Sequence, residues 1–415
     1  MKRNTAFARG LTAQLCMLLL VLVAGAKAAT YSILTSFNGG NGYFAHQTPL
    51  VDSSGNVFSA TEEGGSNGCG VVFELVNHGG GIYTNTPLYN FTCLDDGGYP
   101  YGGVVEDASG NLYGVASEYG AYGAGVIYEL VNEGGGTYSY EVIYTFTGAT
   151  DGNFPEGDLV WHDGSLYGVT DEGGGGDCEP GCGVVFRLTN TGSGWTETVL
   201  HTFSYFTGDG YYPEAGLTFD SKGNIYGTTE GGGSYGSGIV YRLSPLTGFH
   251  GPGVTYDETI LHNFDGAADG CDLESGVILD KAGNLYGTAA YCGVNYDGTV
   301  YQLKRSGGKY EFNVLLQFDY TNGQDSADWT GHLAIDSSGN VYGTAARGGA
   351  YDYGLVFQLA AGTWAFTDLH DFDDNGTDGY EPYGGVSLDS HGNLYGTTTY
   401  GGTSNDGTVW QITAP

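Results

Sequence analysis

The feature that most constrains the fold of this chain is a unit of about 56 residues that recurs seven times. Each copy carries a turn of the form Gly-Asn followed by an aliphatic and an aromatic residue, with Ser replacing Asn in the third copy. A unit of this size cannot bury its own apolar face, so such units pack side by side. The seven turns begin at Gly55, Gly110, Gly164, Gly223, Gly283, Gly339 and Gly392.

Each copy contains four short segments of β-favouring residues, and no segment after residue 28 has a helical period. In the fourth copy the first three segments are 216–220, 224–229 and 238–243. The fourth segment is illustrated by residues 198–203, which belong to the third copy. The 77 glycines and 14% aromatic residues suit many short strands joined by turns. Four strands per copy predict an all-β, seven-bladed β-propeller of four-stranded antiparallel blades.

The two ends of the repeat region predict how the ring closes. Residues 31–37 match the fourth strand of the repeat, whereas residues 407–412 match the third. The last blade therefore lacks its outer strand, and the N-terminal strand has no blade of its own. We expect the N-terminal strand to complete the last blade, because this pairing leaves neither edge bare.

An Asp-x-x-Gly-Asn element joins the first two strands of most copies, as in Asp220 to Asn224. An aspartate can cap such a turn with its carboxylate, and Gly or Asn accepts a positive φ. Acidic spacing also begins calcium loops, but the further ligands and closing glutamate of an EF-hand are missing. The element therefore predicts a tight hairpin.

The first 28 residues have the pattern of a targeting segment. A basic start precedes an apolar run at 15–24, and Ala-Lys-Ala at 26–28 offers a small-x-small cleavage site. The run is too short to span a bilayer comfortably. We predict a signal peptide at 1–28, with an uncleaved anchor as the alternative, and a single propeller domain at 29–415 in a secreted, periplasmic or extracellular protein.

The charge of the mature chain limits its partners. Four of the 12 basic residues lie in the predicted signal peptide, which leaves 8 basic and 47 acidic residues and a net charge near −39. Such a charge repels nucleic acid and anionic membranes and favours cations. We expect no nucleic-acid partner, no membrane span in the mature chain, and a monomer.

Six cysteines remain after signal-peptide removal, an even number that suits an oxidising compartment. Two of them lie in one Cys-Glu-Pro-Gly-Cys loop, and the propeller prediction places the other four in loops on one face. No tetrahedral ligand spacing favours a thiolate metal site. The predicted disulfides are Cys69–Cys93, Cys178–Cys182 and Cys271–Cys292.

The recurring Leu-x-x-Phe, Asp-Gly-x-x-Pro, Asp-x-x-Gly-Asn-Leu-Tyr-Gly-Thr-Thr and Gly-Thr-Val-Phe elements resemble the GloVer tandem-repeat family of exported bacterial proteins. The resemblance covers residues 31–412. It implies propeller-type repeats but brings no established catalytic residue. Members of the family often carry a C-terminal surface anchor; this chain shows none, so we expect release rather than attachment.

The loops before strand one and after strand two should share one face around the channel mouth, where ligands of propellers usually bind. The residue after the proline position of the Asp-Gly-x-x-Pro loop varies between blades, and this position should ring the upper channel. We predict ligand contacts at this ring and in its neighbourhood. The ring positions are His46, Tyr101, Glu156, Glu214, Glu274, Thr330 and Tyr383.

The three ring glutamates come from consecutive blades. If Glu156, Glu214 and Glu274 converge, they could hold a calcium ion, shift one another's pKa values or act as catalytic acid and base. The alternative is that water separates and solvates them independently. We predict no cofactor other than this calcium.

Aromatic residues within the Asp-Gly-x-x-Pro loops, Tyr99, Tyr211 and Tyr380, are candidates for stacking on sugar rings. Their repetition also suits a structural role in the turn and at the blade junction. The sixth copy departs most from the pattern and predicts a second group of ligand contacts, with drift of the repeat pattern as the alternative. This group comprises Asp325, Asp328, Trp329, His332 and Arg347.

Three further histidines, His201, His262 and His370, share one position in strand four, where other copies carry Tyr89, Tyr144 or Gln317. This periodicity predicts packing of the outer strand.

Three functions remain open from the sequence. The first is a non-catalytic module that binds extracellular polysaccharide or a surface partner. The second is an extracellular polysaccharide hydrolase or lyase that uses upper-face carboxylates. The third is a structural envelope or matrix protein. The chain shows no Gly-x-Ser-x-Gly elbow and no His-Glu-x-x-His motif.

Overall fold

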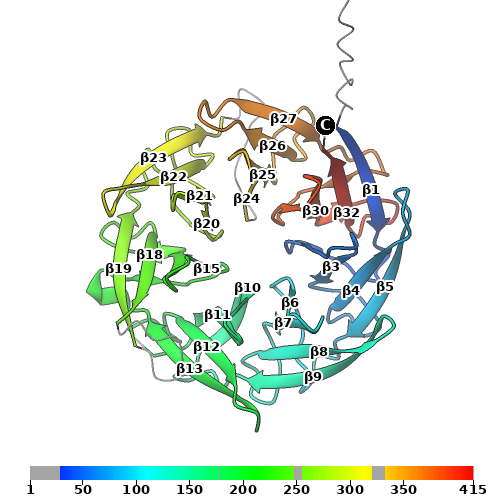
Figure 1. The fold of residues 1–415 in the computed structure, drawn as a ribbon, viewed down its shortest axis with the longest axis horizontal. Coiled ribbons are helices and arrows are strands. Elements are labelled where there is room, and N and C mark those ends of the chain that lie inside the picture. The colour runs from blue at the N-terminus through cyan, green and yellow to red at the C-terminus, as the bar shows by residue number, and fades with distance from the viewer. Residues whose placement is uncertain (1–28, 176, 247–254, 320–331, 415) are drawn as a thin grey trace, which may run out of the picture.

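Seven four-stranded antiparallel sheets stand as blades around a central axis (Figure 1). The computed structural model describes residues 29–175, 177–246, 255–319 and 332–414. The predicted seven-bladed β-propeller is confirmed. The predicted signal peptide at 1–28 lies outside the described residues. Within the described ranges, no helix is both long and apolar enough to cross a bilayer.

Each of the first six blades runs from the channel outward in chain order. Blades one to three comprise β2 (Leu50–Val51), β3 (Val57–Thr61), β4 (Val71–Asn77), β5 (Tyr83–Asn90); β6 (Val105–Glu106), β7 (Leu112–Ala116), β8 (Val126–Gly134), β9 (Thr137–Thr145); and β10 (Asn153–His162), β11 (Ser165–Glu172), β12 (Val184–Asn190), β13 (Trp195–Thr202). Blades four to six comprise β15 (Thr218–Phe219), β16 (Ile225–Thr229), β18 (Ile239–Pro245), β19 (Tyr256–Asn263); β20 (Ile278–Leu279), β21 (Leu285–Ala289), β22 (Thr299–Ser306), β23 (Lys309–Gln317); and β24 (Ala334–Ile335), β25 (Val341–Ala345), β26 (Leu355–Leu359), β27 (Phe366–Asp371).

The seventh blade combines both ends of the chain. Its strands, from the channel outward, are β29 (Ser387–Leu388), β30 (Leu394–Thr398), β32 (Thr408–Thr413) and β1 (Thr30–Ser36). Strand β1 pairs antiparallel with β32, with Ile33 opposite Trp410 and Ser36 opposite Thr408. The predicted closure of the ring by the N-terminal strand is therefore confirmed.

Smaller elements lie in the loops of the face around the channel mouth. Two short ribbons pair a loop before strand one with the loop after strand two of the same blade, and one 3-10 helix precedes the first ribbon. These elements are β14 (Gly210–Tyr211) with β17 (Gly231–Gly232), β28 (Gly379–Tyr380) with β31 (Tyr400–Gly401), and η1 (Tyr205–Thr207).

The Asp-x-x-Gly-Asn element forms the tight hairpin predicted for it. In blade four, Asp220 Oδ1 accepts N–H bonds from Lys222 and Asn224, at 2.8 and 3.0 Å, while Oδ2 accepts bonds from the Asn224 amide and the Tyr226 hydroxyl. These hydrogen bonds hold the pKa of Asp220 below its ordinary value despite burial, which by itself raises it. The carboxylate is thus used to fix the turn between the first two strands.

The glycine in the middle of strand two makes room for an aromatic ring of strand three. A Cβ on Gly227 would lie 2.3 Å from the Tyr241 hydroxyl, and a Cβ on Gly396 would lie 2.2 Å from the Trp410 ring. Both rings are fully buried. The Leu-Tyr-Gly-Thr pattern of strand two therefore reflects close packing within a blade.

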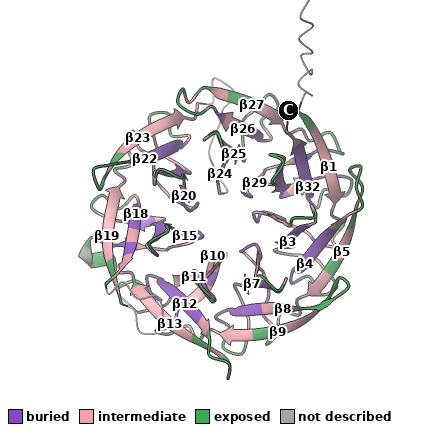
Figure 2. Cartoon of the chain, viewed as in Figure 1, coloured by how far each residue is buried: buried purple, intermediate pink, exposed green. Residues whose placement is uncertain are grey.

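The hydrophobic core lies between neighbouring blades. A fully buried phenylalanine follows every fourth strand and packs at an angle against a ring from strand three of the next blade, at centroid distances of 5.1 to 6.0 Å. Figure 2 shows the result, with the second and third strands of each blade buried and the outer strand more exposed. The seven pairs are Phe37–Phe73, Phe91–Tyr128, Phe146–Phe186, Phe203–Tyr241, Phe264–Tyr301, Phe318–Phe357 and Phe372–Trp410.

A one-residue bulge interrupts the outer strand pair in all seven blades. The register corrects one sequence alignment. His262 lies opposite Val240, and the residue at the same place in the next blade is Leu316, opposite Val300. Gln317 is therefore not the counterpart of the strand-four histidines, because it lies one residue further along, opposite Thr299.

All three predicted disulfides are present: Cys69–Cys93, Cys178–Cys182 and Cys271–Cys292. Two of them tie a loop after strand two to a loop before strand one. The three disulfides indicate an oxidising, extracytoplasmic location.

Candidate functional site

A cavity of about 260 Å³ lies at the mouth of the channel. All seven blades contribute to its walls, six of them with residues from the loop before strand one and the third with residues of β10. All six ring positions that the structure describes line this cavity, and Thr330 lies outside the described residues. The lining residues are His46, Gln47, Thr48, Tyr101, Glu156, Gly157, Asp158, Glu214, Ala215, Glu274, Ser275, His332, Tyr383 and Gly385.

Hydroxyl groups of strand two hold these loops in place across the blade boundaries. Thr228 donates to the Ser275 carbonyl at 2.9 Å, and Thr397 donates to the Gln47 carbonyl at 3.0 Å. Both threonines are buried. The threonine after the strand-two glycine therefore positions the rim of the next blade.

The backbone of the rim is held in an unfavourable conformation. The residue just before the proline position has a positive φ, between 51° and 62°, in all six blades where that position is described. Non-glycine residues rarely adopt this region, and such strain gathers at functional sites. The residues concerned are Phe44, Tyr99, Phe154, Tyr212, Asp272 and Glu381.

His332 extends across the channel beneath the ring. Its Nε2 lies 3.9 Å from Asp158 Oδ2, and a Cβ on Gly276 would lie 2.7 Å from its ring. Most blades carry glycine at the His332 position, which leaves space for this one imidazole. His332 and Asp158 thus form the floor of the cavity.

One half of the cavity is acidic. Burial, followed by the charges of Asp171 and Glu172, raises the pKa of Glu156 well above its ordinary value. Burial and then Glu156 raise the pKa of Glu214 to about 10. Burial, followed by Glu172 and Glu230, raises the pKa of Asp171 to about 7. At neutral pH Glu214 therefore presents a protonated carboxyl group on this wall, which both donates and accepts hydrogen bonds.

The other half is aromatic. The rings of His46 and Tyr101 meet edge to face at 5.3 Å, and His46 Nε2 lies 3.0 Å from Glu62 Oε2. Tyr383 completes this wall and donates its hydroxyl to Glu381 at 3.2 Å. Among the described residues that line the cavity, none is lysine or arginine.

The three ring glutamates share the cavity without forming a ready metal site. Across the described part of the chain, only His201, Asp209 and Glu258 bring three potential ligand atoms within 4.8 Å of one another. Calcium at Glu156, Glu214 and Glu274 stays a prediction, for which the geometry supplies no preformed ligand set.

The remaining predicted residues do not line the cavity. Tyr380 stacks on Tyr400, and Tyr99 lies against Tyr119, which fits the structural role considered for the loop aromatics. Tyr211 contacts Tyr205 at 5.3 Å. Arg347 forms an ion pair with Glu381 at 3.7 Å. Asp325, Asp328 and Trp329 lie outside the described residues.

Sequence reasoning missed a set of exposed tyrosines in the loops after strand two. These loops lie on the cavity face, because successive antiparallel strands return the chain to it. The signal was a tyrosine two or three residues beyond a Gly-Gly, Cys-Gly or Tyr-Gly step in several copies. The exposed side chains are Tyr122 (67%), Tyr235 (66%), Tyr296 (78%) and Tyr351 (55%).

The repeat pattern that builds this face matches a known family model, the Gloeobacter/Verrucomicrobia repeat, over residues 46–256 and 220–415. The chain belongs to the Gloeobacter/Verrucomicrobia repeat family. This identification confirms the resemblance to GloVer repeats. No curated protein matches the chain significantly.

Solved structures share the fold of this family member at low sequence identity. A putative 6-phosphogluconolactonase from Bacteroides uniformis matches at 14% identity with a TM-score of 0.52, covering 82% of this chain and 88% of that one. One from Bacteroides fragilis matches at 14% identity with a TM-score of 0.50, covering 82% and 87%. At this identity the likeness shows a common propeller fold alone.

Proposed function

We propose that this protein is a secreted binding module that captures the terminal unit of an extracellular polysaccharide in the channel-mouth cavity. The observation that carries the proposal is the division of that cavity into an acidic and an aromatic half. Protonated carboxyl groups pair with sugar hydroxyls, while the faces of Tyr101 and Tyr383 suit the C–H face of a sugar ring.

The size and charge of the site favour this ligand class. The cavity is smaller than the roughly 300–1,000 Å³ of most ligand pockets, so it suits one end of a chain. The exposed tyrosines on the same face would accommodate the units that follow. A phosphorylated sugar is disfavoured, because the lining offers carboxyl groups in place of lysine or arginine. We therefore infer a neutral or amino sugar.

A second candidate is hydrolysis or lysis of the same polysaccharide. It is favoured by the differing pKa values of Glu214, held protonated at neutral pH, and Asp171, which titrates near neutrality. Two carboxyl groups with pKa values this far apart suit the roles of general acid and general base in one site.

One experiment tests both candidates. The mature chain is applied to an array of neutral, amino and acidic glycans with and without calcium, and the ligands it retains are then assayed for product release. Binding should fall at least about fivefold in Tyr101→Ala and in Glu274→Gln, since losing a contact at the centre of a binding site costs over about 1 kcal/mol. His391→Ala, on the exposed hairpin face, is the matched control.

The outcomes separate the candidates. Binding without product release supports the module, and product release that is lost in Glu214→Gln supports the enzyme. No retained glycan, or equal retention by all variants, would contradict both and favour a structural protein.

A further inference from the structure

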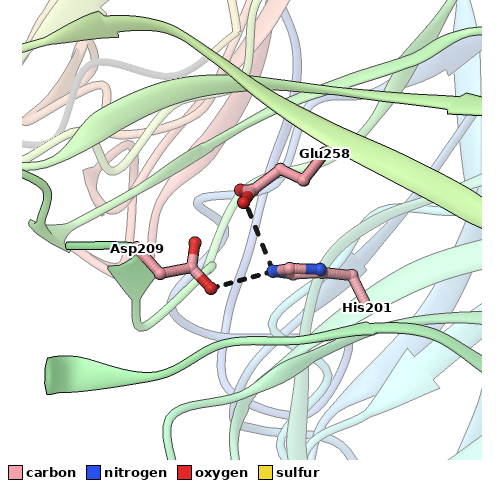
Figure 3. Close-up of side chains that lie close together, drawn as sticks. All are labelled: His201, Asp209 and Glu258. Atoms are coloured by element: carbon pink, nitrogen blue, oxygen red, sulfur yellow. Dashed lines mark hydrogen bonds and ion pairs between the residues drawn. The ribbon is translucent and has the colours of Figure 1, made fainter. Parts of the chain in front are cut away.

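A histidine and two carboxylates from adjoining blades meet at the boundary between blades three and four (Figure 3). His201 comes from β13, Asp209 from the loop that follows it, and Glu258 from β19 of the next blade. His201 Nε2 lies 3.0 Å from Asp209 Oδ2 and 3.8 Å from Glu258 Oε1. The side chains are 10 to 19% exposed. The predicted outer-strand packing does not account for the second carboxylate.

The same boundary elsewhere in the ring shows what is unusual here. His262 pairs with Asp269 at 3.0 Å, and its ring stacks on Phe312 of the next blade at 3.9 Å. His370 likewise pairs with Asp378 and stacks on Tyr31. Glu258 stands where Phe312 and Tyr31 stand at the other two boundaries. It lies opposite Leu243 in its blade, and Phe312 lies opposite the equivalent residue, Leu303, in the next.

Replacing a ring by Glu258 is difficult to explain by packing alone. It removes an aromatic stack and leaves Glu258 Oε1 buried without a hydrogen-bond partner among the described residues. Two carboxyl groups from neighbouring blades therefore face a single imidazole in a largely buried site.

The atoms lie within a few tenths of an ångström of the spacing that ligands of one cation need from His201. Ligands 2.0–2.2 Å from a tetrahedral Zn²⁺ lie roughly 3.3–3.6 Å from one another. The two distances from His201 Nε2 fall on either side of this range. Asp209 Oδ1 accepts the Gly210 N–H at 2.8 Å, which leaves Oδ2 directed at the site.

We propose that His201, Asp209 and Glu258 form a binding site for a divalent transition-metal ion such as Zn²⁺ at the boundary between blades three and four. One imidazole nitrogen with two carboxylate oxygens suits such ions, whereas calcium takes six to eight oxygen ligands. The fourth position of the metal is open to water or to an incoming ligand. Binding would link two blades that otherwise meet mainly through apolar contacts.

The test is titration calorimetry of the mature, disulfide-bonded protein with Zn²⁺ in excess Ca²⁺, which occupies weak acidic surface sites. One site per chain is expected. Glu258→Gln and His201→Gln should each weaken it at least about tenfold, because each removes a ligand. His370→Gln, at the boundary where Tyr31 covers the histidine, is the control and should bind as the parent does.

Two further variants keep the test independent of misfolding. Glu258→Phe recreates the His262–Phe312 stack and should fold normally without binding Zn²⁺. Phe312→Glu should create a second site at His262 and Asp269 and raise the stoichiometry from one to two. A parent chain that takes up no Zn²⁺, or equal binding by Glu258→Phe, would overturn the proposal.

Discussion

At the scale of single residues, Glu214 gives a testable pH dependence. Its pKa is raised to about 10 in the folded protein, first by burial. The folded state therefore binds more protons than the unfolded state above about pH 4.5, and stability falls as pH rises through the window from 4.5 to 10. Glu214→Gln removes this cost and should raise the free energy of unfolding by about 2–3 kcal/mol at pH 8, but not at pH 4.

Urea denaturation at the two pH values measures this effect. Glu141→Gln, at an exposed position on β9, is the matched control and should change stability by less than about 0.5 kcal/mol at either pH. A gain in Glu214→Gln that is equal at pH 4 and pH 8 would show that the carboxyl group ionises normally in the folded protein.

The ring of variable residues could be found from the sequence, but the protonation of its glutamates could not. Position in the repeat is enough to place Glu156 and Glu214 at the mouth. Their raised pKa values also depend on Asp171, near the end of β11, and on Glu230, directly after β16 of the next blade. That proximity depends on how the blades stand around the channel, and the repeat pattern does not specify it.

At the scale of secondary-structure elements, the contact across each blade boundary should determine stability. Phe264 is fully buried after β19 and meets Tyr301 of β22 at 5.1 Å. Phe264→Ala should lower the free energy of unfolding by about 3–5 kcal/mol, because the tightly packed boundary cannot close the cavity. Phe206→Ala, the same substitution at a side chain 75% exposed, should cost under about 0.5 kcal/mol. Similar denaturation midpoints for the two variants would contradict a core located between blades.

Strands and hairpins were predictable because each is encoded within one copy of the repeat. The metal-ligand group was not recognised, since Glu258 lies one copy away from His201 and meets it only across the boundary. The signal was nevertheless present. The position six residues before the phenylalanine that follows strand four is aromatic in four blades, as Tyr31, Tyr140, Phe312 and Phe366. It holds Asn85 in the first blade, and Glu197 and Glu258 in the third and fourth. This column was overlooked because the bulge in each outer strand pair adds one residue. The simple alternation of inward and outward side chains along the strand therefore does not predict which positions are equivalent.

At the scale of the whole molecule, the ring is held shut by a strand that is far from its sheet in the sequence. Tyr31 of strand β1 stacks on His370 of blade six, and Phe37, which directly follows β1, packs on Phe73 of blade one. The N-terminal strand therefore joins three blades. Deleting it would bare both an edge of β32 and the apolar surface of two boundaries.

A circular permutant tests this closure without removing any contact. Thr30 and Thr413 are paired neighbours, with the Thr30 N–H 3.1 Å from Thr413 Oγ1, so a short glycine linker can join residue 414 to residue 29. A chain that begins at Asn38 and ends with β1 then holds the seventh blade in one continuous segment. It should keep the circular-dichroism spectrum and have a denaturation midpoint equal to or above that of the parent, because closure no longer depends on distant ends. A chain that simply lacks 29–37 should unfold at markedly lower urea, and a permutant that fails to fold would mean that β1 must pair before the other blades assemble.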